Sequence, residues 1–538
     1  MDRTLFLERI IERKSPWDIA VIGGGATGVG IAVDAASRGY DVLLLEQSDF
    51  GKGTSSRSTK LVHGGVRYLQ QGNISLVIEA LKERGILLQN APHLVHDLQF
   101  IVPNYQWWEA PFYGIGLKVY DLLAGKYGFG PSKVLSKEEV LKRIPTLEQD
   151  GLRGGVNYHD GQFDDSRLLV NLAQTAAEQG ACLVNYAKVG SLSKDKDGFA
   201  NGIDFIDCET GKSYSLPARC VINATGPFCD AVRQLDDPNA APIIAPSQGV
   251  HVVLSRDFLP RDTAIMVPHT RDGRVMFAIP WNGHVVVGTT DTPISTATLE
   301  PKALESEVDF ILETASDYLA KRPSKNDLLS VFTGIRPLVD AGDSSNTSVL
   351  SRDHTIQISK SGLLTVTGGK WTTYRKMAQD AIDQAAVLGH LEERPCITRE
   401  LRIHGYHRHS EKFGDLAGYG SDAVLMEELA HKRPELNESL HSSLPIRGVQ
   451  VVWAVRNEMA RTLDDVLARR TRALYLNVRA ARDMAPKVAE IMAKELGLDD
   501  AWIKNQINEF ERIAGCYDIN SLMDEIKQKN NFLRNGDD

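Results

Sequence analysis

The sequence is poor in cysteine and contains no long apolar run. Its 538 residues include six cysteines and no CxxC pair. A disulfide framework is therefore not expected, and a reducing compartment is favoured. No stretch approaches the roughly 18 uninterrupted apolar residues typical of a membrane-spanning helix. The N-terminal segment also lacks the apolar core and cleavage pattern of a secretory signal.

Basic residues are not in excess, because the net charge is -9. This balance argues against a general attraction to nucleic acid or anionic lipid. A site for an anionic substrate must then supply its own cluster of positive charge. The hydrophobic content of 42% and the charged content of 24% are ordinary for a globular protein. The length suggests about three domains.

Residues 18–46 have the pattern of a strand, a turn, a helix and a second strand. The apolar runs 19–22 and 42–45 are predicted to form neighbouring parallel strands, and residues 27–37 the helix between them. This βαβ arrangement indicates an α/β domain built on a parallel sheet.

Three glycines in this turn fit the GxGxxG pattern of a dinucleotide site. Gly23 permits the tight turn, Gly25 lets a pyrophosphate approach the backbone, and Gly28 lets helix and strand pack closely. The helix would direct unpaired N–H groups at the phosphates. Glu46 ends the second strand, where a carboxylate can accept from ribose hydroxyls. A lone GxGxxG also occurs in ordinary glycine-rich turns, but this context favours dinucleotide binding.

Two further segments favour FAD over NAD. The apolar run 221–226 ends in small residues and would bring backbone beside the same cofactor, although an ordinary strand can end in the same way. Residues 368–370 are Gly-Gly-Lys at the start of a predicted helix, which gives a second positive helix start. NAD alone would not need a site closed by segments so far apart.

The patterns of strands and helices divide the chain into three domains, two of them discontinuous. Residues 245–335 alternate as in an antiparallel sheet inserted into the nucleotide-binding fold, and residues 420–530 are mostly helical. The expected ranges are 15–95, 155–235 and 350–390 for the nucleotide-binding domain, 96–154 and 236–349 for the substrate-binding domain, and 395–530 for an α-helical C-terminal domain.

Two long segments, residues 22–39 and 368–378, resemble the signatures of the FAD-dependent glycerol-3-phosphate dehydrogenase family. Shorter segments that are similar to this family are residues 54–69, 280–281, 288–291, 334–337 and 458–472. The resemblance extends from about Trp17 to about Glu490, so it covers most of the chain.

The resemblance implies an α/β fold with an FAD-binding Rossmann-like domain of the glutathione-reductase and D-amino-acid-oxidase type. An inserted antiparallel-sheet substrate domain and an α-helical C-terminal domain complete it. The implied reaction oxidises sn-glycerol 3-phosphate to dihydroxyacetone phosphate by hydride transfer to FAD, and a respiratory quinone takes the electrons. Further FAD contacts are expected besides the three glycines and Glu46. The family-like segments add Thr54, Ser55, Ser56, Gly369, Lys370 and Thr372, and the apolar run 221–226 adds Ala224, Thr225 and Gly226.

By the same resemblance, Arg67, Tyr68, Arg336 and Lys370 surround the substrate. Arginine suits a phosphate group because its planar fork can bind two oxygens at once. Our hypothesis is that Arg336 and Lys370 hold the phosphate while Arg67 stabilises the alkoxide that develops at C2. A single arginine taken alone would more often belong to a surface ion pair.

Histidine has the right unperturbed pKa for the base that takes the C2 hydroxyl proton. Two candidates stand out, His251 in a predicted strand and His63 just before Arg67. We prefer His251 and keep His63 as the alternative, since either residue could instead be structural. His404, His407 and His409 cluster in a polar stretch without a nearby cysteine or acidic ligand. They are predicted to be solvated, and no metal site is expected.

The expected location is cytoplasmic, with peripheral attachment to the inner face of the cell membrane. Residues 3–14 mix apolar and basic side chains, as in a short amphipathic helix. Residues 107–123 offer aromatic side chains and leucines with few charges. For both segments, packing against the protein's own core is an equal alternative. Nucleic acid is not an expected partner, and a homodimer is left open.

Two other functions remain open. An oxidase of the same family would pass the electrons to oxygen and make hydrogen peroxide. The short connection between residues 378 and 400 favours a dehydrogenase, because the family's oxidases often carry an insertion there. The second alternative is a non-catalytic flavin-binding scaffold, or an RNA-contacting flavoprotein that uses Arg469, Arg470 and Arg472. The acidic balance argues against RNA, and a solvated or domain-packing face is the better interpretation of these arginines.

Overall fold

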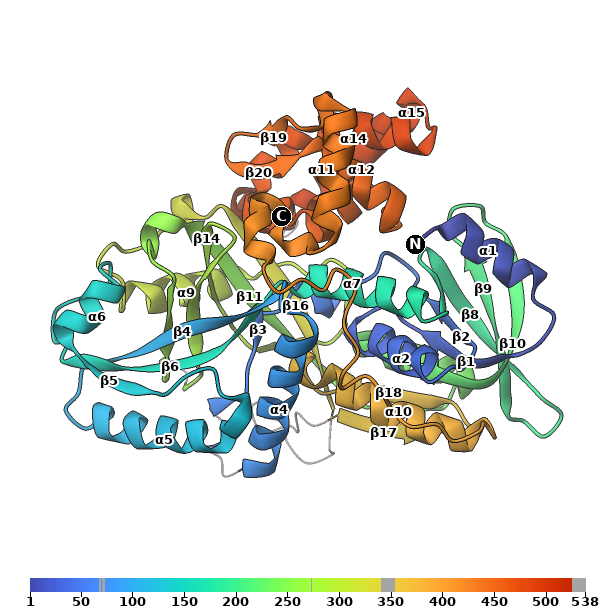
Figure 1. The fold of residues 1–538 in the computed structure, drawn as a ribbon, viewed down its shortest axis with the longest axis horizontal. Coiled ribbons are helices and arrows are strands. Elements are labelled where there is room, and N and C mark those ends of the chain that lie inside the picture. Colours follow the sequence, from blue (N-terminus) through green and yellow to red (C-terminus); the bar gives the residue numbers. More distant parts are fainter. Residues whose placement is uncertain (67–68, 70–72, 272, 340–353, 525–538) are drawn as a thin grey trace, which may run out of the picture.

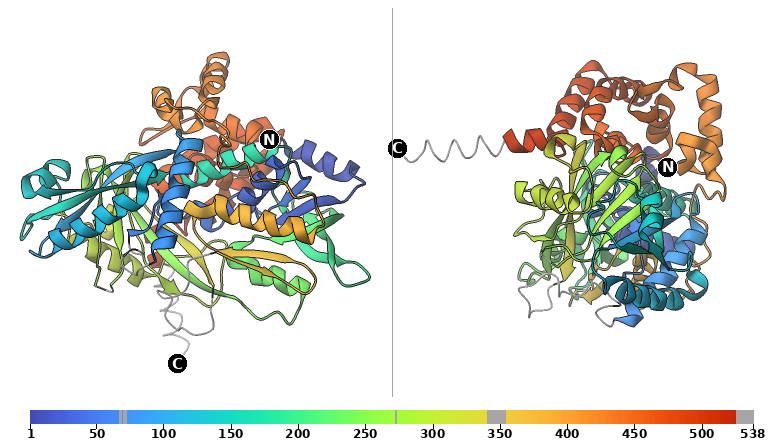
Figure 2. Two further views of the ribbon diagram at one scale, coloured as in Figure 1. Left: turned by 60° about the horizontal axis from the view of Figure 1, so that its bottom comes forward. Right: turned by 90° about the vertical axis from the view of Figure 1, so that its left-hand side faces the viewer.

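The computed structural model describes residues 1–524 except 67–68, 70–72, 272 and 340–353. Two sheets lie side by side, and a layer formed mainly of helices from the C-terminal part of the chain covers the seam between them (Figure 1). Figure 2 shows the same arrangement from two other directions. Loops from both sheets therefore meet beneath the C-terminal helices.

The first sheet has the parallel core that the sequence predicts. Its strands run in the order β17 (His354–Ile358), β18 (Leu364–Gly368), β10 (Ser213–Asn223), β1 (Trp17–Ile22), β2 (Val42–Leu45) and β7 (Cys182–Val184). All neighbours in this order are parallel except β17 and β18. Both faces are covered, as the apolar strand sequences require.

Alternate residues of β1 show how both faces of the sheet are covered. Ile19 and Val21 pack with α2 (Ala26–Ser37), α7 (Asp165–Glu178) and α10 (Tyr374–Leu388) on one face. Ala20 and Ile22 pack on the other face with β8 (Ala187–Lys194), β9 (Ala200–Asp207) and α1 (Arg3–Glu12). Successive strand residues point to opposite faces, so one apolar run serves two cores.

The second sheet follows the order β15 (Thr292–Pro293), β11 (Ile244–Ser255), β14 (His284–Gly288), β13 (Met276–Trp281), β12 (Thr263–Val267), β4 (Val95–Asn104), β6 (Gly154–Phe163) and β3 (Leu61–Val62). In addition, β16 (Ser330–Val339) pairs with β11, and β5 (Lys133–Ser136) pairs with β6. The pairs are antiparallel apart from β12 with β4, which makes the sheet mixed rather than purely antiparallel. Strands β3 and β6 belong here, although the expected ranges assigned most of their residues to the nucleotide-binding domain.

The C-terminal region is helical, as predicted. Its helices are α11 (Asp422–Lys432), α12 (Gly448–Asn457), α13 (Ala473–Leu476), α14 (Val478–Leu496) and α15 (Asp500–Ala514), with a small hairpin of β19 (Ser439–His441) and β20 (Leu444–Arg447). The π-helical turn η9 (Asp465–Arg470) ends in Arg469 and Arg470, and Arg472 follows as the N-cap of α13.

Arg469, Arg470 and Arg472 are almost completely buried, so they do not form a solvated face or an RNA-binding one. Arg469 and Arg470 both donate to Asp49 in the loop after β2, at 2.5–2.8 Å. The domain-packing interpretation is therefore correct.

The predicted N-terminal helix is present as α1, and part of its apolar surface belongs to the protein's own core. Phe6 and Ile10 pack against the first sheet, and buried Arg3 pairs with Asp207 at 2.5 Å. Leu5 and Ile11 are exposed. Within the described part of the chain, no helix is both long and apolar enough to cross a membrane.

His404 is largely covered and held by two carboxylates, whereas the sequence-based prediction had it solvated. Its ring bridges Glu178 of α7 at 2.5 Å and Asp422 of α11 at 2.8 Å, and so joins the first sheet's helices to the C-terminal ones. Burial lowers the pKa of His404, but the hydrogen bonds and charges of Asp422 and Glu178 outweigh burial and raise the pKa to about 9. The neighbouring His409 is exposed.

We expect the His404 bridge to stabilise the fold in a pH-dependent way. Because its pKa is raised from about 6.5 to about 9, its contribution is full below pH 6.5 and is lost as the pH rises through 9. The shift corresponds to at most about 3 kcal/mol. His404→Gln should lower the melting temperature by several degrees at pH 6, and by much less at pH 9.5. His409→Gln is the control, and an equal effect of His404→Gln at both pH values would contradict the bridge.

Candidate active site

A cavity of about 990 Å³ lies where the loops of the two sheets meet. The first sheet contributes the turn after β1, the end of β2 and the segments after β10 and β18, whereas the second sheet contributes β11, β16 and the loop after β14. Its size is at the upper end of the roughly 300–1,000 Å³ typical of ligand sites. It can therefore hold a dinucleotide together with a small substrate.

The glycine turn after β1 has the close approaches that the sequence predicts. Gly23 has a φ of 110°, and a Cβ there would come within 2.7 Å of the carbonyl oxygen of Ala224. A Cβ at Gly28 would clash with the carbonyl oxygen of Gly23, so this glycine serves helix–strand packing and does not line the cavity. Gly25 is the N-cap of α2 and has no side chain to cap the helix, so the start of α2 lies at the cavity wall, which Gly25, Ala26 and Thr27 line.

Glu46 lines the cavity and also stabilises the turn. Its two oxygens accept from the backbone N–H of Gly24 at 2.6 Å and of Ser48 at 2.8 Å. Burial raises the pKa of Glu46, and these two backbone donors partly offset the rise. A carboxylate has lone pairs left for a ribose hydroxyl, so the predicted contact fits this geometry.

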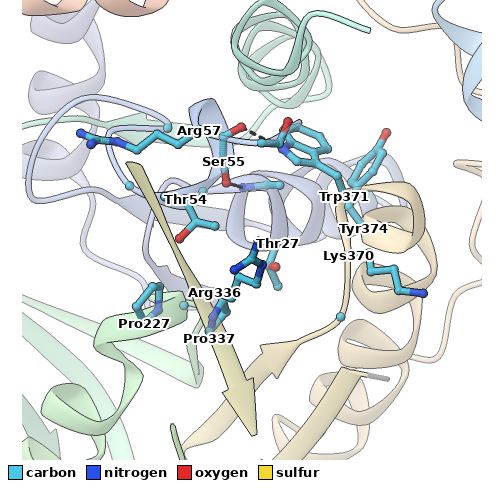
Figure 3. A pocket seen from close by; sticks show the side chains of 18 of the residues that line it. Thr27, Thr54, Ser55, Arg57, Pro227, Arg336, Pro337, Lys370, Trp371 and Tyr374 are labelled. Carbon is cyan, nitrogen blue, oxygen red and sulfur yellow. Dashed lines mark hydrogen bonds between the residues drawn. The ribbon is translucent and has the colours of Figure 1, made fainter. Parts of the chain in front are cut away.

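The segment after β18 closes the cavity from a distant part of the chain. The indole N–H of Trp371 donates to the carbonyl oxygen of Ser55 at 2.8 Å, and the hydroxyl of Ser55 accepts from the N–H of Ala26 at 2.9 Å (Figure 3). Gly369 has a φ of 70°, and a Cβ there would approach the Met377 sulfur at 2.5 Å. The backbone comes close to the cavity on three sides, which fits an extended dinucleotide such as FAD.

The second sheet brings His251 and Arg336 to the same face of neighbouring strands. Residue pairing sets Arg336 opposite Ser247, four residues before His251, and alternate residues of a strand share a face. Gly249 lies between Ser247 and His251, and a Cβ there would collide with the Arg336 guanidinium. The glycine therefore makes room for the arginine.

The guanidinium of Arg336 is held in place by the loop after β14. It donates to a carboxylate oxygen of Asp291 at 3.1 Å, to the carbonyl oxygen of Thr290 at 2.9 Å and to the Thr289 hydroxyl at 3.2 Å. Arg336 and Lys370 both line the cavity and come from different sheets (Figure 3). The cavity thus gains positive charge in a protein that is acidic overall.

His251 is buried beside the cavity with a neutral ring. Burial lowers the pKa of His251 well below its ordinary value, and Lys60 and Arg336 lower it further. Its Nε2 lies 2.9 Å from the Thr59 hydroxyl, and Phe332 stacks on the ring with centroids 4.8 Å apart. His63 also lines the cavity, and its backbone N–H donates to the Thr372 hydroxyl at 3.2 Å.

Residues 18–375 match the family of FAD dependent oxidoreductases, and residues 364–503 match the C-terminal domain of alpha-glycerophosphate oxidase. Glycerol-3-phosphate dehydrogenase, mitochondrial, of Rattus norvegicus is 42% identical over 520 residues, which cover 90% of this chain and 71% of the relative. The Homo sapiens protein of the same name is 42% identical over 524 residues, which cover 91% of this chain and 72% of the relative. The chain belongs to the FAD-dependent glycerol-3-phosphate dehydrogenase family.

Solved structures agree with this family assignment. A glycerol-3-phosphate dehydrogenase from Bacillus halodurans, complexed with FAD, is similar at a TM-score of 0.78 and 30% identity over 96% of this chain and 97% of that one. The L-alpha-glycerophosphate oxidase of Mycoplasma pneumoniae shares the fold at a TM-score of 0.54 and 18% identity, over 72% of this chain and 98% of that one. The predicted α/β fold with an FAD-binding domain is confirmed, and FAD is the cofactor of this family member.

The fold brings most of the predicted site residues of this family member together. The cavity is lined by Gly23, Gly25, Glu46, Thr54, Ser55, His63, Ala224, Thr225, Gly226, His251, Arg336, Gly369, Lys370 and Thr372. Ser56 is a correction, because its hydroxyl is buried against that of Tyr475 at 3.1 Å and does not reach the cavity. Arg67 and Tyr68 lie outside the described residues.

Several cavity residues were not foreseen from the sequence. Phe100, Tyr158, Met266 and Phe277 of the second sheet form an apolar part of the cavity wall. Thr59 lies in a family-like segment, and its contact with His251 had no local signal because the two residues are 192 positions apart. Side chains of ordinary strands acquire such positions only through tertiary packing.

We expect Gly23→Ala to yield a protein that is largely free of flavin. A Cβ at this position combines an unfavourable positive φ with a clash against Ala224. The measurement is the ratio of flavin to protein absorbance after purification and after incubation with excess FAD. Gly53→Ala is the matched control, because a Cβ on this cavity-lining glycine meets no atom within 4 Å. Full flavin content in Gly23→Ala would contradict the assigned turn.

Proposed function

We propose that this chain oxidises sn-glycerol 3-phosphate to dihydroxyacetone phosphate and passes the electrons to a membrane quinone. One observation carries the proposal: a single cavity joins a dinucleotide-binding backbone to a wall bearing Arg336, Lys370 and His251. The bound FAD supplies the acceptor for the hydride that leaves C2 of the substrate. The protein must then hold the phosphate, orient C2 and receive the hydroxyl proton.

Arg336 and Lys370 are proposed to bind the phosphate dianion. The contacts of Arg336 with Asp291 and Thr290 fix its orientation before the substrate arrives, which lowers the entropy cost of binding. Lys370 precedes the short helix η6 (Trp371–Thr373) and lines the same cavity as Arg336. The proposed role of Arg67, stabilising the alkoxide at C2, stays a prediction.

His251 is the proposed base, and His63 remains the alternative. A neutral imidazole can accept a proton, and His251 is neutral because burial, Lys60 and Arg336 hold its pKa well below the ordinary value. A bound phosphate dianion would offset the two cations and make the ring more basic. The substrate thereby helps to generate the base that its oxidation requires.

Replacing Arg336 with Gln should raise KM for glycerol 3-phosphate by about 10- to 100-fold, because a charge-assisted contact contributes roughly 1.5–3 kcal/mol. Flavin content should stay normal, since the change lies on the second sheet. The measurement is anaerobic flavin reduction at varied substrate concentration. Arg271→Gln, which alters an exposed arginine, is the control. An unchanged KM in Arg336→Gln would show that Arg336 does not bind the substrate phosphate.

A membrane quinone as acceptor is supported by the exposed face of α5 (Glu109–Ala124). One side of this helix packs inward through Tyr113, Leu117 and Tyr120. The apolar side chains left exposed on the helix and just before it are Trp107, Trp108, Phe112, Ile115, Val119 and Leu122. From Trp108 onward they recur at helical spacing on one face, and an exposed apolar stripe of this kind suits a membrane interface.

The position of α5 agrees with peripheral attachment at the inner face of the cell membrane. The helix lies at the end of the molecule opposite the C-terminal helices (Figure 1). Phe100, one residue of the apolar part of the cavity wall, belongs to β4, a strand that α5 contacts. An apolar acceptor could therefore approach from this side. If oxygen is the acceptor instead, turnover will produce hydrogen peroxide without an added quinone.

Introducing charge on α5 by the double change Ile115→Asp and Leu122→Asp should reduce vesicle binding several-fold. Quinone-dependent turnover should fall with it, whereas turnover with a water-soluble dye should not change. Cosedimentation with phospholipid vesicles measures vesicle binding, and parallel assays with the quinone and with the dye measure turnover. The control is Val424→Asp with Leu425→Asp, two exposed apolar residues of α11. Equal vesicle binding by both double variants would exclude the α5 face.

A further inference from the structure

The two ring nitrogens of His251 have different surroundings. Nδ1 is buried and has no hydrogen-bond partner among the described residues, whereas Nε2 lies 2.9 Å from the hydroxyl oxygen of Thr59. The whole side chain is 3% exposed, while Thr59 is more accessible and lines the cavity. Both residues line the cavity, and the more accessible Thr59 hydroxyl is the group that contacts Nε2.

We propose that Thr59 is a catalytic residue that relays the substrate's proton to His251. The inference rests on the proposed oxidation and adds a step to it. As the C2–H bond breaks and its electron pair leaves as hydride for the cofactor, the C2 hydroxyl proton moves to the oxygen of Thr59. The hydroxyl proton of Thr59 moves to Nε2 of His251 in the same step. The carbon loses two electrons, a C=O bond forms, and Thr59 ends as the neutral hydroxyl it was at the start.

The backbone around Thr59 is anchored on both sides by one carboxylate. Asp165 accepts from the N–H of Ser58 at 3.1 Å, from the Ser58 hydroxyl at 2.7 Å and from the Lys60 ammonium at 2.6 Å. Lys60 has a φ of 64°, and its side chain is fully buried. The left-handed conformation of Lys60 is maintained by these contacts, so the Thr59 hydroxyl is directed at His251 before any substrate binds.

The C-terminal region completes this anchor. Arg472 donates to Asp165 and to the carbonyl oxygen of Ser56, both at 3.0 Å. Its guanidinium carbon lies 4.2 Å from the ring centroid of Tyr475 and 5.2 Å from that of Trp281. The segment that carries Thr59 is thus held by a helix of the first sheet and by the C-terminal helices together. Asp165 and Arg472 are positioning residues in this scheme.

Charged groups surround the relay, and burial lowers the pKa of one of them, Lys60, to about 7. Lys60 and Arg336 are the cations that act on His251, and Asp165 and Arg472 act on Lys60. Asp291 faces Arg336 from the loop after β14. The imidazole is therefore unprotonated when the substrate arrives, and Thr59 covers the nitrogen that will accept the proton.

The test compares Thr59→Val, which removes the hydroxyl at nearly constant volume, with Thr59→Ser, which keeps it. Anaerobic stopped-flow reduction of the holoenzyme flavin by glycerol 3-phosphate gives the limiting rate and the substrate Kd. General acid–base catalysis contributes about 10²- to 10⁴-fold. Thr59→Val should therefore slow the limiting rate by about 100-fold or more, with little change in Kd or flavin content. The limiting rate of Thr59→Ser should stay within several-fold of that of the unaltered enzyme. Thr210→Val, which changes an exposed threonine outside the cavity, is the control and should have the limiting rate of the unaltered enzyme.

A limiting rate in Thr59→Val equal to that of the unaltered enzyme would overturn the relay, because the proton would then pass directly to the imidazole. If Thr59→Val fails to bind FAD, the relay can still be tested by a second measurement on the unaltered enzyme. Two protons in flight predict a curved dependence of the reduction rate on the D₂O fraction, and a straight line would overturn the relay. If the unaltered holoenzyme is not reduced by glycerol 3-phosphate at all, the proposed function itself fails and the relay fails with it.

Discussion

Buried ion pairs between the loop after β2 and the C-terminal helices are the constraint on which the site depends. Asp49 has no exposed surface and accepts from Arg469 and Arg470. Burial raises the pKa of Asp49, but the two arginines outweigh burial and hold the pKa below its ordinary value. Breaking a buried pair of this kind costs about 3–5 kcal/mol. The loop that leads to Thr54, Ser55 and Thr59 is thereby fixed by a part of the chain more than 400 residues away.

The two sheets contribute different chemistry to the cavity. The parallel sheet contributes mainly backbone, because its strands end at glycine turns and helix starts of the kind that bind phosphate. The second sheet presents side chains, because alternate residues of β11 and β16 face the same side. The proposed chemistry needs both, since a bound dinucleotide alone has no group to hold the substrate phosphate.

The sequence-based errors share one physical origin. Ser56 was expected to contact FAD and instead meets Tyr475, while His404 was expected to be solvated and instead bridges two carboxylates. In both cases the deciding partner lies far away in the chain. Local polarity predicts exposure only when no distant charge or hydroxyl packs against the group, and here Tyr475 and Glu178 are such partners.

The sequence by itself determined the βαβ unit, the glycine turn and the family, because these depend on spacing within short segments. It also identified Arg336, Lys370 and His251 as site candidates through their segments. The tertiary structure alone decided that the second sheet is mixed, that Asp165 anchors Lys60 across 105 residues, and that Thr59 covers His251 across 192. Such contacts form between residues that are far apart in the sequence, where strands pair and buried polar groups find partners. The local periodicity of the sequence therefore does not predict them.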